Sequence, residues 1–143
     1  MTPDVGNPAP VLLDTSAAVP IVFEDHEYHD AVFAALTGRE RGLAGHAAFE
    51  TFSVMTRLPL PARRSPAGAG RILARDFPQT RFLSAEGSAN LLELLASHGI
   101  SGGSVYDALV GAAALEHGLP LMTRDRRAVA IYRALGVEVE TLD

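Results

Sequence analysis

The chain lacks two reactive residue types. Its 143 residues include no cysteine, and all 12 of its basic residues are arginines, so lysine is absent too. Without cysteine there is no thiol nucleophile, no disulfide, no iron–sulfur cluster and no cysteine-bound zinc. Without lysine there is no phosphate-loop lysine, no Schiff-base lysine and no kinase-type lysine. These two absences exclude the enzyme classes whose chemistry depends on a cysteine or a lysine.

Long apolar runs and a targeting leader are also missing. No apolar run approaches the length of a membrane span, and residues 1–10 (MTPDVGNPAP) have neither a positive start nor an apolar segment. The net charge of -5 is mild and differs from the basic balance of a protein that coats nucleic acid. Without such segments, we expect a cytoplasmic protein with a flexible lead-in over 1–10. Because 48% of the residues are hydrophobic, we expect one domain with its own core over 11–143.

Short apolar segments alternate with helical patterns along the whole chain. The expected strands span residues 11–13, 43–44, 81–83, 119–123 and 137–142. The expected helices span residues 17–23, 25–36, 46–57, 69–75, 85–97, 104–117 and 126–135. Strands separated by helices predict an α/β fold, a three-layer α/β/α sandwich around a mainly parallel sheet of about five short strands.

Acids follow two of the expected strands. Asp14 comes directly after the apolar run 11–13, and Asp125 lies just past the strand that ends at Thr123. Ligands of open parallel sheets bind outside the carboxyl ends of the strands, and both positions fall on that edge. Two more acids stand in apolar surroundings, Glu50 on a helix with aromatic neighbours and Asp107 in the first turn of an apolar helix. We expect the four carboxylates to converge.

Buried carboxylates are costly unless positive charge meets them. Because lysine is absent and arginine is scarce beside three of the four acids, a divalent cation is the expected compensation. Oxygen ligands without cysteine or paired histidine favour Mg²⁺ or Mn²⁺ over zinc. One or two such ions bridge a phosphate and activate water, which predicts phosphodiester hydrolysis. Three arginines flank Asp125 and suit phosphate contacts: Arg124, Arg126 and Arg127.

Each of these residues, taken alone, also has an ordinary structural explanation. Asp14 and Asp125 fit helix caps or turn residues. Asp107 fits a partner of a helix dipole, and Glu50 a solvated helix residue. The arginines are individually typical of a protein surface. Only the conjunction of four acids, in this order and with these flanks, favours a metal site.

The same motifs resemble the PIN-domain family. They are Asp14-Thr15-Ser16, then Glu50, then Gly-Gly-Ser-Val-Tyr-Asp107-Ala-Leu, then Leu-Met-Thr-Arg-Asp125. Within the family, the sequence is most similar to the VapC-type toxins of bacterial toxin–antitoxin (VapBC) pairs, from Val11 to Leu142. Short patterns such as DTS and YDAL occur by chance, but four acids in register are specific. One local departure is Ser104, where many relatives carry arginine.

The resemblance implies an Mg²⁺- or Mn²⁺-dependent endoribonuclease that arrests translation by cutting tRNA or ribosomal RNA. It implies four metal-binding catalytic acids: Asp14, Glu50, Asp107 and Asp125. It implies three polar residues that orient the site or its water: Thr15, Ser16 and Thr123. It further implies a homodimer and a cognate VapB-type antitoxin whose arginine-bearing tail occupies the acidic site.

Substrate choice is expected in surface loops such as 59–70, with Arg63 and Arg64 as further candidates for contacts with RNA. Two alternatives are also consistent with the sequence. One is a different Mg²⁺-dependent phosphate enzyme, such as a phosphatase or a phospho-acceptor domain, although a receiver-like site would lack its lysine. The other is a catalytically inactive PIN-fold binding module, which the cost of keeping buried carboxylates argues against.

Overall fold

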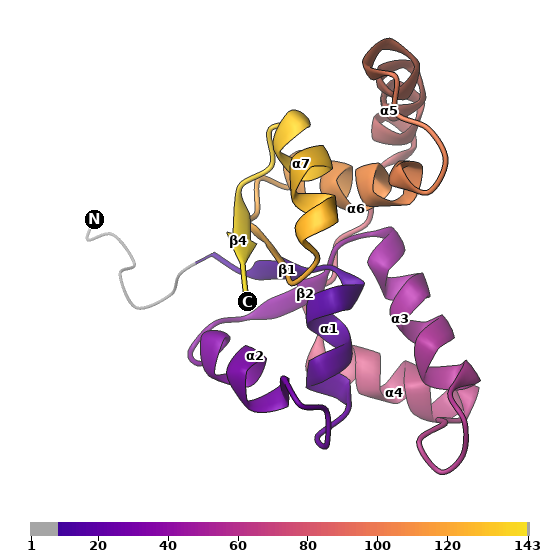
Figure 1. The fold of residues 1–143 in the computed structure, drawn as a ribbon, viewed down its shortest axis with the longest axis vertical. Coiled ribbons are helices and arrows are strands. Elements are labelled where there is room, and N and C mark those ends of the chain that lie inside the picture. The colour runs from indigo at the N-terminus through magenta and orange to yellow at the C-terminus, as the bar shows by residue number, and fades with distance from the viewer. Residues whose placement is uncertain (1–8, 143) are drawn as a thin grey trace.

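The computed structural model describes residues 9–142, and most of the expected lead-in at 1–10 therefore lies outside the described residues. Four strands and seven helices follow one another within this range (Figure 1). In chain order they are β1 (Val11–Leu13), α1 (Thr15–Val22), α2 (His29–Ala35), β2 (Arg41–Leu43), α3 (His46–Arg57), α4 (Pro66–Asp76), α5 (Ala85–His98), α6 (Ser104–Glu116), β3 (Leu121–Thr123), α7 (Arg126–Ala134) and β4 (Val139–Thr141).

The strands form one parallel sheet in the order β2-β1-β3-β4. The chain lays β2 on one side of β1, then crosses over and lays β3 on the other side. Leu12 accordingly pairs with Gly42 on one neighbour and with Leu121 on the other. The strand order reverses between β1 and β3, and in open sheets this switch point is where a crevice forms at the carboxyl ends.

The sheet has four strands among the described residues instead of about five. The expected strand at 81–83 makes only one isolated bridge, between Arg81 and Ala44. Immediately afterwards the Ser84 hydroxyl accepts a hydrogen bond from the Gly87 amide at the start of α5. Because the chain turns into this helix so soon, the segment touches the edge of the sheet for a single residue and cannot extend the ladder.

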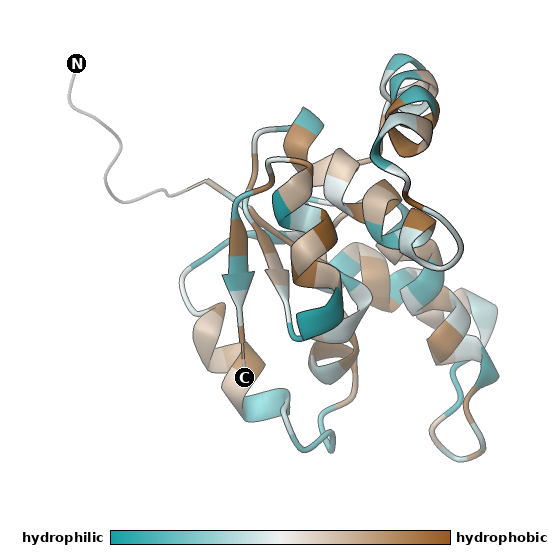
Figure 2. Ribbon diagram, turned by 45° about the horizontal axis from the view of Figure 1, so that its top comes forward, coloured by the Kyte–Doolittle hydropathy of each residue, from teal (hydrophilic) through white to brown (hydrophobic). Residues whose placement is uncertain are grey.

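Side chains of β1 alternate between two cores, as a strand between two helical layers requires. Val11 and Leu13 pack in a core with residues of α1 to α4, whereas Leu12 packs with residues of α6 and α7. In Figure 2 the strands carry mostly hydrophobic residues and the helices alternate between hydrophobic and hydrophilic bands. The three-layer α/β/α sandwich is confirmed.

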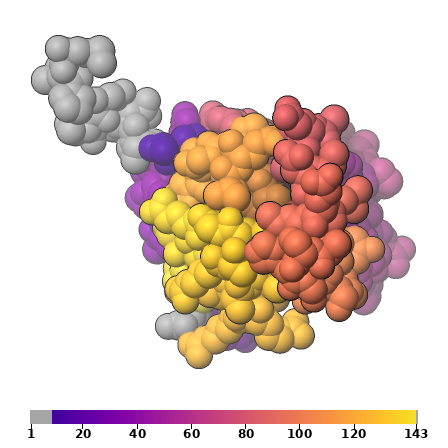
Figure 3. Space-filling view, turned by 90° about the horizontal axis from the view of Figure 1, so that it is seen from above, coloured from indigo at the N-terminus to yellow at the C-terminus, as the bar shows by residue number. Residues whose placement is uncertain are grey.

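Helix α5 lies outside this sandwich. It packs on α6 through a separate small core that includes Leu91, Leu95 and Ala108. Figure 3 shows α5, α6 and α7 side by side on the face seen from above. No helix within residues 9–142 is both long enough and apolar enough to cross a bilayer.

Two helices begin earlier than the apolar pattern predicted, because a capping residue sets the start of each. The helix expected from residue 17 begins at Thr15, because the Asp14 carboxylate caps it by accepting a hydrogen bond from the Ala17 amide. The helix expected from residue 69 begins at Pro66, because the Ser65 hydroxyl caps it and proline fits the first turn. The helix expected over 25–36 is shorter, and α2 begins only at His29.

The close approach of β2 to the backbone of Gln79 yields a stability prediction. A Cβ on buried Gly42 would overlap the Gln79 carbonyl, and backbone cannot move aside cheaply. Gly42→Ala should therefore lower the free energy of unfolding by roughly 3 kcal/mol. Gly70→Ala is the control, since its Cβ meets nothing within 4 Å and it lies inside α4. Gly70→Ala should raise the free energy of unfolding by about 0.5–1 kcal/mol. Urea unfolding of both variants checks the contrast, and equal effects would contradict it.

Candidate active site

The four predicted acids line one cavity at the carboxyl edge of the sheet. Asp14 follows β1 and Asp125 follows the adjacent β3, whereas Glu50 comes from α3 and Asp107 from the first turn of α6. The cavity measures about 60 Å³. Its lining comprises Asp14, Thr15, Ser16, Glu50, Asp107, Val110, Asp125 and Tyr132. Segments spread over most of the chain therefore supply carboxylates to one place.

Asp14 is the most enclosed of these acids, with 4% of its surface exposed. Its carboxylate accepts four hydrogen bonds. Oδ1 accepts from the Ser16 hydroxyl at 2.6 Å and from the Ala17 amide at 3.2 Å. Oδ2 accepts from the hydroxyls of Thr123 and Tyr132, the latter at 2.8 Å. These four donors replace the hydrogen bonds that the carboxylate would make with water, which is why this acid tolerates burial.

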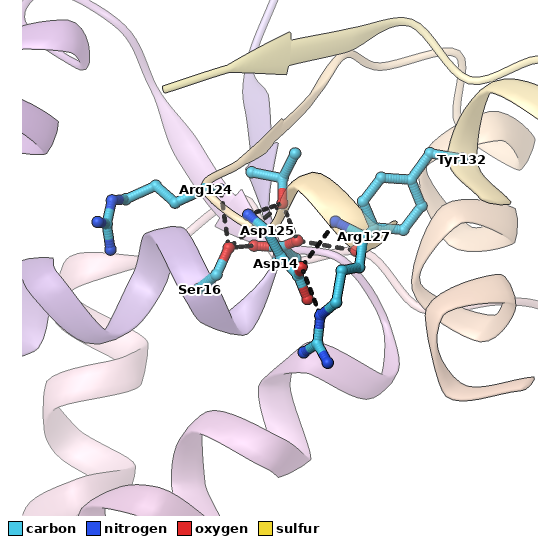
Figure 4. Close-up of polar contacts among 7 residues, drawn as sticks. Asp14, Ser16, Arg124, Asp125, Arg127 and Tyr132 are labelled. Carbon is cyan, nitrogen blue, oxygen red and sulfur yellow. Dashed lines mark hydrogen bonds and ion pairs between the residues drawn. The ribbon is translucent and has the colours of Figure 1, made fainter. Parts of the chain in front are cut away.

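The hydroxyls of Ser16 and Thr123 accept hydrogen bonds from backbone amides that follow β3. The Ser16 oxygen accepts from the Arg124 amide at 2.8 Å, and the Thr123 oxygen accepts from the Asp125 amide at 3.0 Å. The two oxygens also lie 3.2 Å from each other, and both hydroxyls donate to Asp14, because a carboxylate oxygen accepts. Figure 4 shows this network converging on the carboxylate. Ser16 and Thr123, predicted as supporting residues, both contact Asp14.

Tyr132 also belongs to the network, although it is not among the site residues predicted from the sequence. Its ring is buried on α7, where a tyrosine ordinarily reads as a core residue. The spacing in the sequence could have indicated its position: Tyr132 lies seven residues, or two helical turns, after Asp125, so both residues lie on the same face of the helix. Burial, then the charge of Asp14 and the hydrogen bond to it, raise the pKa of the Tyr132 phenol far above its ordinary value. The hydroxyl therefore stays protonated and donates.

The charges in the cavity repel one another. Burial, and then the negative charges of Asp125, Glu50 and Asp14, raise the pKa of Asp107, while Arg127 lowers it. Glu50 has weaker partners: the Thr15 hydroxyl at 3.4 Å and the His46 ring nitrogen at 3.5 Å. The predicted supporting residue Thr15 thus contacts Glu50.

The three arginines beside Asp125 have different positions. Arg127 stays at the acids: its Nε lies 3.5 Å from the Asp125 carboxylate, and the side chain is 93% exposed. The Arg124 guanidinium lies 3.6 Å from the centre of the Tyr28 ring and points away from Asp14 in Figure 4. Arg126 is exposed in the first turn of α7. Arg127 is therefore best placed for a group that enters the cavity.

Arg63 and Arg64 lie elsewhere. Both belong to the connection that follows the last residue of α3, whereas Glu50 lies near the start of that helix. Arg63 donates to the Leu58 carbonyl, and the Arg64 guanidinium stacks 5.2 Å from the centre of the Phe23 ring. Neither residue lines the acidic cavity.

The donor set suits a hydrated, hard cation. The polar side chains that line the cavity offer only carboxylate and hydroxyl oxygens, the ligands that Mg²⁺ and Mn²⁺ prefer. Within residues 9–142, no three His, Asp or Glu side chains stand where all of them would coordinate one ion. Mg²⁺ commonly keeps several waters and takes only one or two carboxylates, so the arrangement fits it.

The chain belongs to the PIN-domain family, whose model matches residues 11–134. It is 45% identical over 130 residues to Ribonuclease VapC27 of Mycobacterium tuberculosis strain H37Rv, which covers 91% of this chain and 95% of the relative. It is 44% identical over 129 residues to Ribonuclease VapC40 of strain CDC 1551 of the same species, covering 89% and 95%.

Solved structures share the fold. Mycobacterium tuberculosis VapC20, a toxin that cleaves the sarcin–ricin loop, has a TM-score of 0.65 at 18% identity and covers 84% of this chain and 93% of its own. VapBC2 from Rickettsia felis, solved on a fragment of its promoter DNA, has a TM-score of 0.66 at 15% identity, covering 93% and 98%. At such identities the likeness establishes the fold alone.

The raised pKa of Asp107, caused by burial and by the neighbouring negative charges, predicts how Asp107→Asn changes stability with pH. Because the pKa of Asp107 is raised in the folded protein, its ionisation costs stability as the pH rises through that pKa. In EDTA at pH 7–8, Asp107→Asn should therefore melt higher than the wild type. Since the carboxyl is only partly buried, the gain stays below about 1 kcal/mol, or under about 4 °C.

This melting difference should shrink toward pH 4, where a protonated Asp107 and an asparagine are nearly equivalent. Thermal unfolding in EDTA across pH 4–8 measures it. Glu93→Gln, an exposed acid on α5, is the control and should show no such trend. A gain that is constant with pH, or a less stable Asp107→Asn protein at pH 8, would show that ionised Asp107 does not cost the fold stability.

Proposed function

We propose that this protein is the toxin of a toxin–antitoxin pair, an Mg²⁺- or Mn²⁺-dependent endoribonuclease that cuts tRNA or ribosomal RNA and arrests translation. Residues 11–143 form its one nuclease domain, and it acts in the cytoplasm, where these RNAs are. The observation that carries the proposal is the set of four carboxylates in one cavity at the switch point of the sheet. The names of VapC27 and VapC40, both called ribonucleases, support the choice of RNA as substrate.

Asp14, Glu50, Asp107 and Asp125 would hold the one or two ions. When bound, such an ion polarises the scissile phosphate and lowers the pKa of a coordinated water. The chain's own part is to fix the ligands. Ser16, Thr123 and Tyr132 hold the Asp14 carboxylate in one orientation, and Thr15 approaches Glu50.

Phosphate oxygens of the RNA would meet Arg127. Arg127 and Ser104 line a second hollow of about 420 Å³, together with Gly103, Asp107 and Asp125. The hollow shares two acids with the catalytic cavity, so a strand that enters it reaches the metal-binding carboxylates. Arg126 is exposed in the first turn of the same helix and extends the positive side of this surface. Arg63 and Arg64 would contact RNA only at a distance from the chemistry.

A cognate VapB-type antitoxin would inhibit the enzyme by inserting an arginine-bearing tail among these acids. Solved neighbours such as VapBC2 of Rickettsia felis and VapBC of Salmonella typhimurium are toxin–antitoxin complexes on DNA. The toxin itself would form a homodimer. Phe49 and Phe82, 64% and 52% exposed with ring centres 5.9 Å apart, form an apolar surface that suits such an interface.

RNA cleavage tests the proposed activity. Purified protein with Mg²⁺ or Mn²⁺ should cut end-labelled total tRNA or ribosomal RNA into discrete fragments, and EDTA should abolish cutting. Asp107→Asn should reduce the rate at least about 100-fold, because a carboxyl of the metal site is lost. The control Glu93→Gln should cut like the wild type.

Other outcomes of this experiment point to the alternatives. Hydrolysis of a small phosphate ester without RNA cleavage would favour another phosphate enzyme. No cleavage by folded, metal-loaded protein, together with no growth arrest on induced expression, would favour an inactive binding module.

The proposed homodimer is tested by molar mass. Light scattering after size exclusion should give twice the chain mass for the wild type, and Phe49→Asp should give the mass of one chain. Leu60→Asp is the matched control, since Leu60 is 75% exposed and lies in the connection after α3. A monomeric wild type, or a dimer unaffected by Phe49→Asp, would remove Phe49 from the interface.

A further inference from the structure

We infer that Tyr132 is the positioning residue that fixes Asp14 relative to Asp107 and Asp125. This inference rests on the proposed metal-dependent function and concerns the ligand geometry of the same cavity. Tyr132 touches Asp14 through its hydroxyl and α6 through its ring. In this role it acts through Asp14 and does not itself meet the substrate.

The hydrogen bond from Tyr132 differs in kind from the others that reach Asp14. Ser16 and Ala17 lie on the same segment as Asp14, and Thr123 lies on the neighbouring strand. These three donors therefore fix the carboxylate only within the sheet and the start of α1. Tyr132 donates from α7, in the helical layer on the other side of the sheet. It alone among these donors ties Asp14 to that layer.

The same layer supplies two of the other acids. Asp125 caps α7 by accepting from the Arg127 amide, and α7 carries Tyr132 two turns later. The bond from Tyr132 to Asp14 thus connects both ends of one short helix to the acidic cavity. Tyr132 lines the same cavity as Asp14, Asp107 and Asp125.

The Tyr132 ring packs against Gly111. Gly111 lies on α6 one turn after Asp107, and a Cβ added there would approach the ring at 3.0 Å and the Leu135 side chain at 3.1 Å. Such contacts are too tight unless the neighbours shift by a few tenths of an ångström. The absence of a side chain on Gly111 therefore lets the ring pack directly on α6, which carries Asp107. Tyr132 is held on one side by α6 and reaches Asp14 on the other.

Tyr132→Phe tests this role, because it keeps the ring and removes only the hydroxyl. Mn²⁺ titration followed by electron paramagnetic resonance measures the affinity for the metal directly. The variant should bind Mn²⁺ about tenfold more weakly, the usual cost of losing a partner that orients a metal ligand. RNA cleavage should need correspondingly more metal to reach half its maximal rate. Tyr28→Phe is the matched control and should stay within about twofold of the wild type, since its ring remains beneath Arg124.

Thermal unfolding in EDTA separates positioning from support of the fold. Loss of stability with unchanged Mn²⁺ affinity would give Tyr132 a merely structural role and overturn the inference. Unchanged affinity with unchanged stability would overturn it as well. A wild type that binds no Mn²⁺ and cuts no RNA would instead refute the proposed function on which the inference rests.

Gly111→Ala gives a second, independent test. By pressing on the ring it should weaken Mn²⁺ binding severalfold in the wild type. In a Tyr132→Phe background the same change should have little further effect, because the hydrogen bond to Asp14 is already gone. Independent, multiplicative losses in the double variant would show that Gly111 does not act through Tyr132.

Discussion

The structure depends on keeping the buried carboxylate of Asp14 supplied with hydrogen-bond donors. An acid with 4% of its surface exposed would ordinarily be expelled from a fold or neutralised. Here four donors surround it, and they come from three elements: Ser16 and Ala17 from α1, Thr123 from β3 and Tyr132 from α7. The network that makes the burial of Asp14 tolerable is therefore the same network that assembles the carboxyl edge of the sheet.

Capping and site building coincide at this edge. Asp14 caps α1 and Asp125 caps α7, and both still line the acidic cavity. The coincidence has a simple cause: in a parallel α/β fold, helices begin where strands end, so N-terminal helix caps and the crevice at the carboxyl ends occupy the same place. Asp14 and Asp125 can therefore each cap a helix and also belong to the acidic cavity, because the two roles do not exclude each other.

Ionised Asp107 costs the protein stability, because it is partly buried and lies near three other acids, and its raised pKa reflects that cost. Arg127 offsets part of it from the rim, while Arg124 is withdrawn to Tyr28 and adds no charge contact to the cavity. A cavity left mainly negative is suited to a divalent cation. The same arrangement explains why an arginine-bearing inhibitor segment would fit the proposed toxin.

Local sequence patterns were sufficient to predict the α/β class, both ends of α3 and the four acids that line the cavity. This was possible because apolar periodicity and acids at strand ends are local patterns. Three other features could be known only from the folded chain: Arg81 makes a single bridge, Arg124 contacts Tyr28, and Tyr132 reaches Asp14. These outcomes depend on contacts between distant segments, 118 positions apart for Tyr132 and Asp14, which no local pattern encodes.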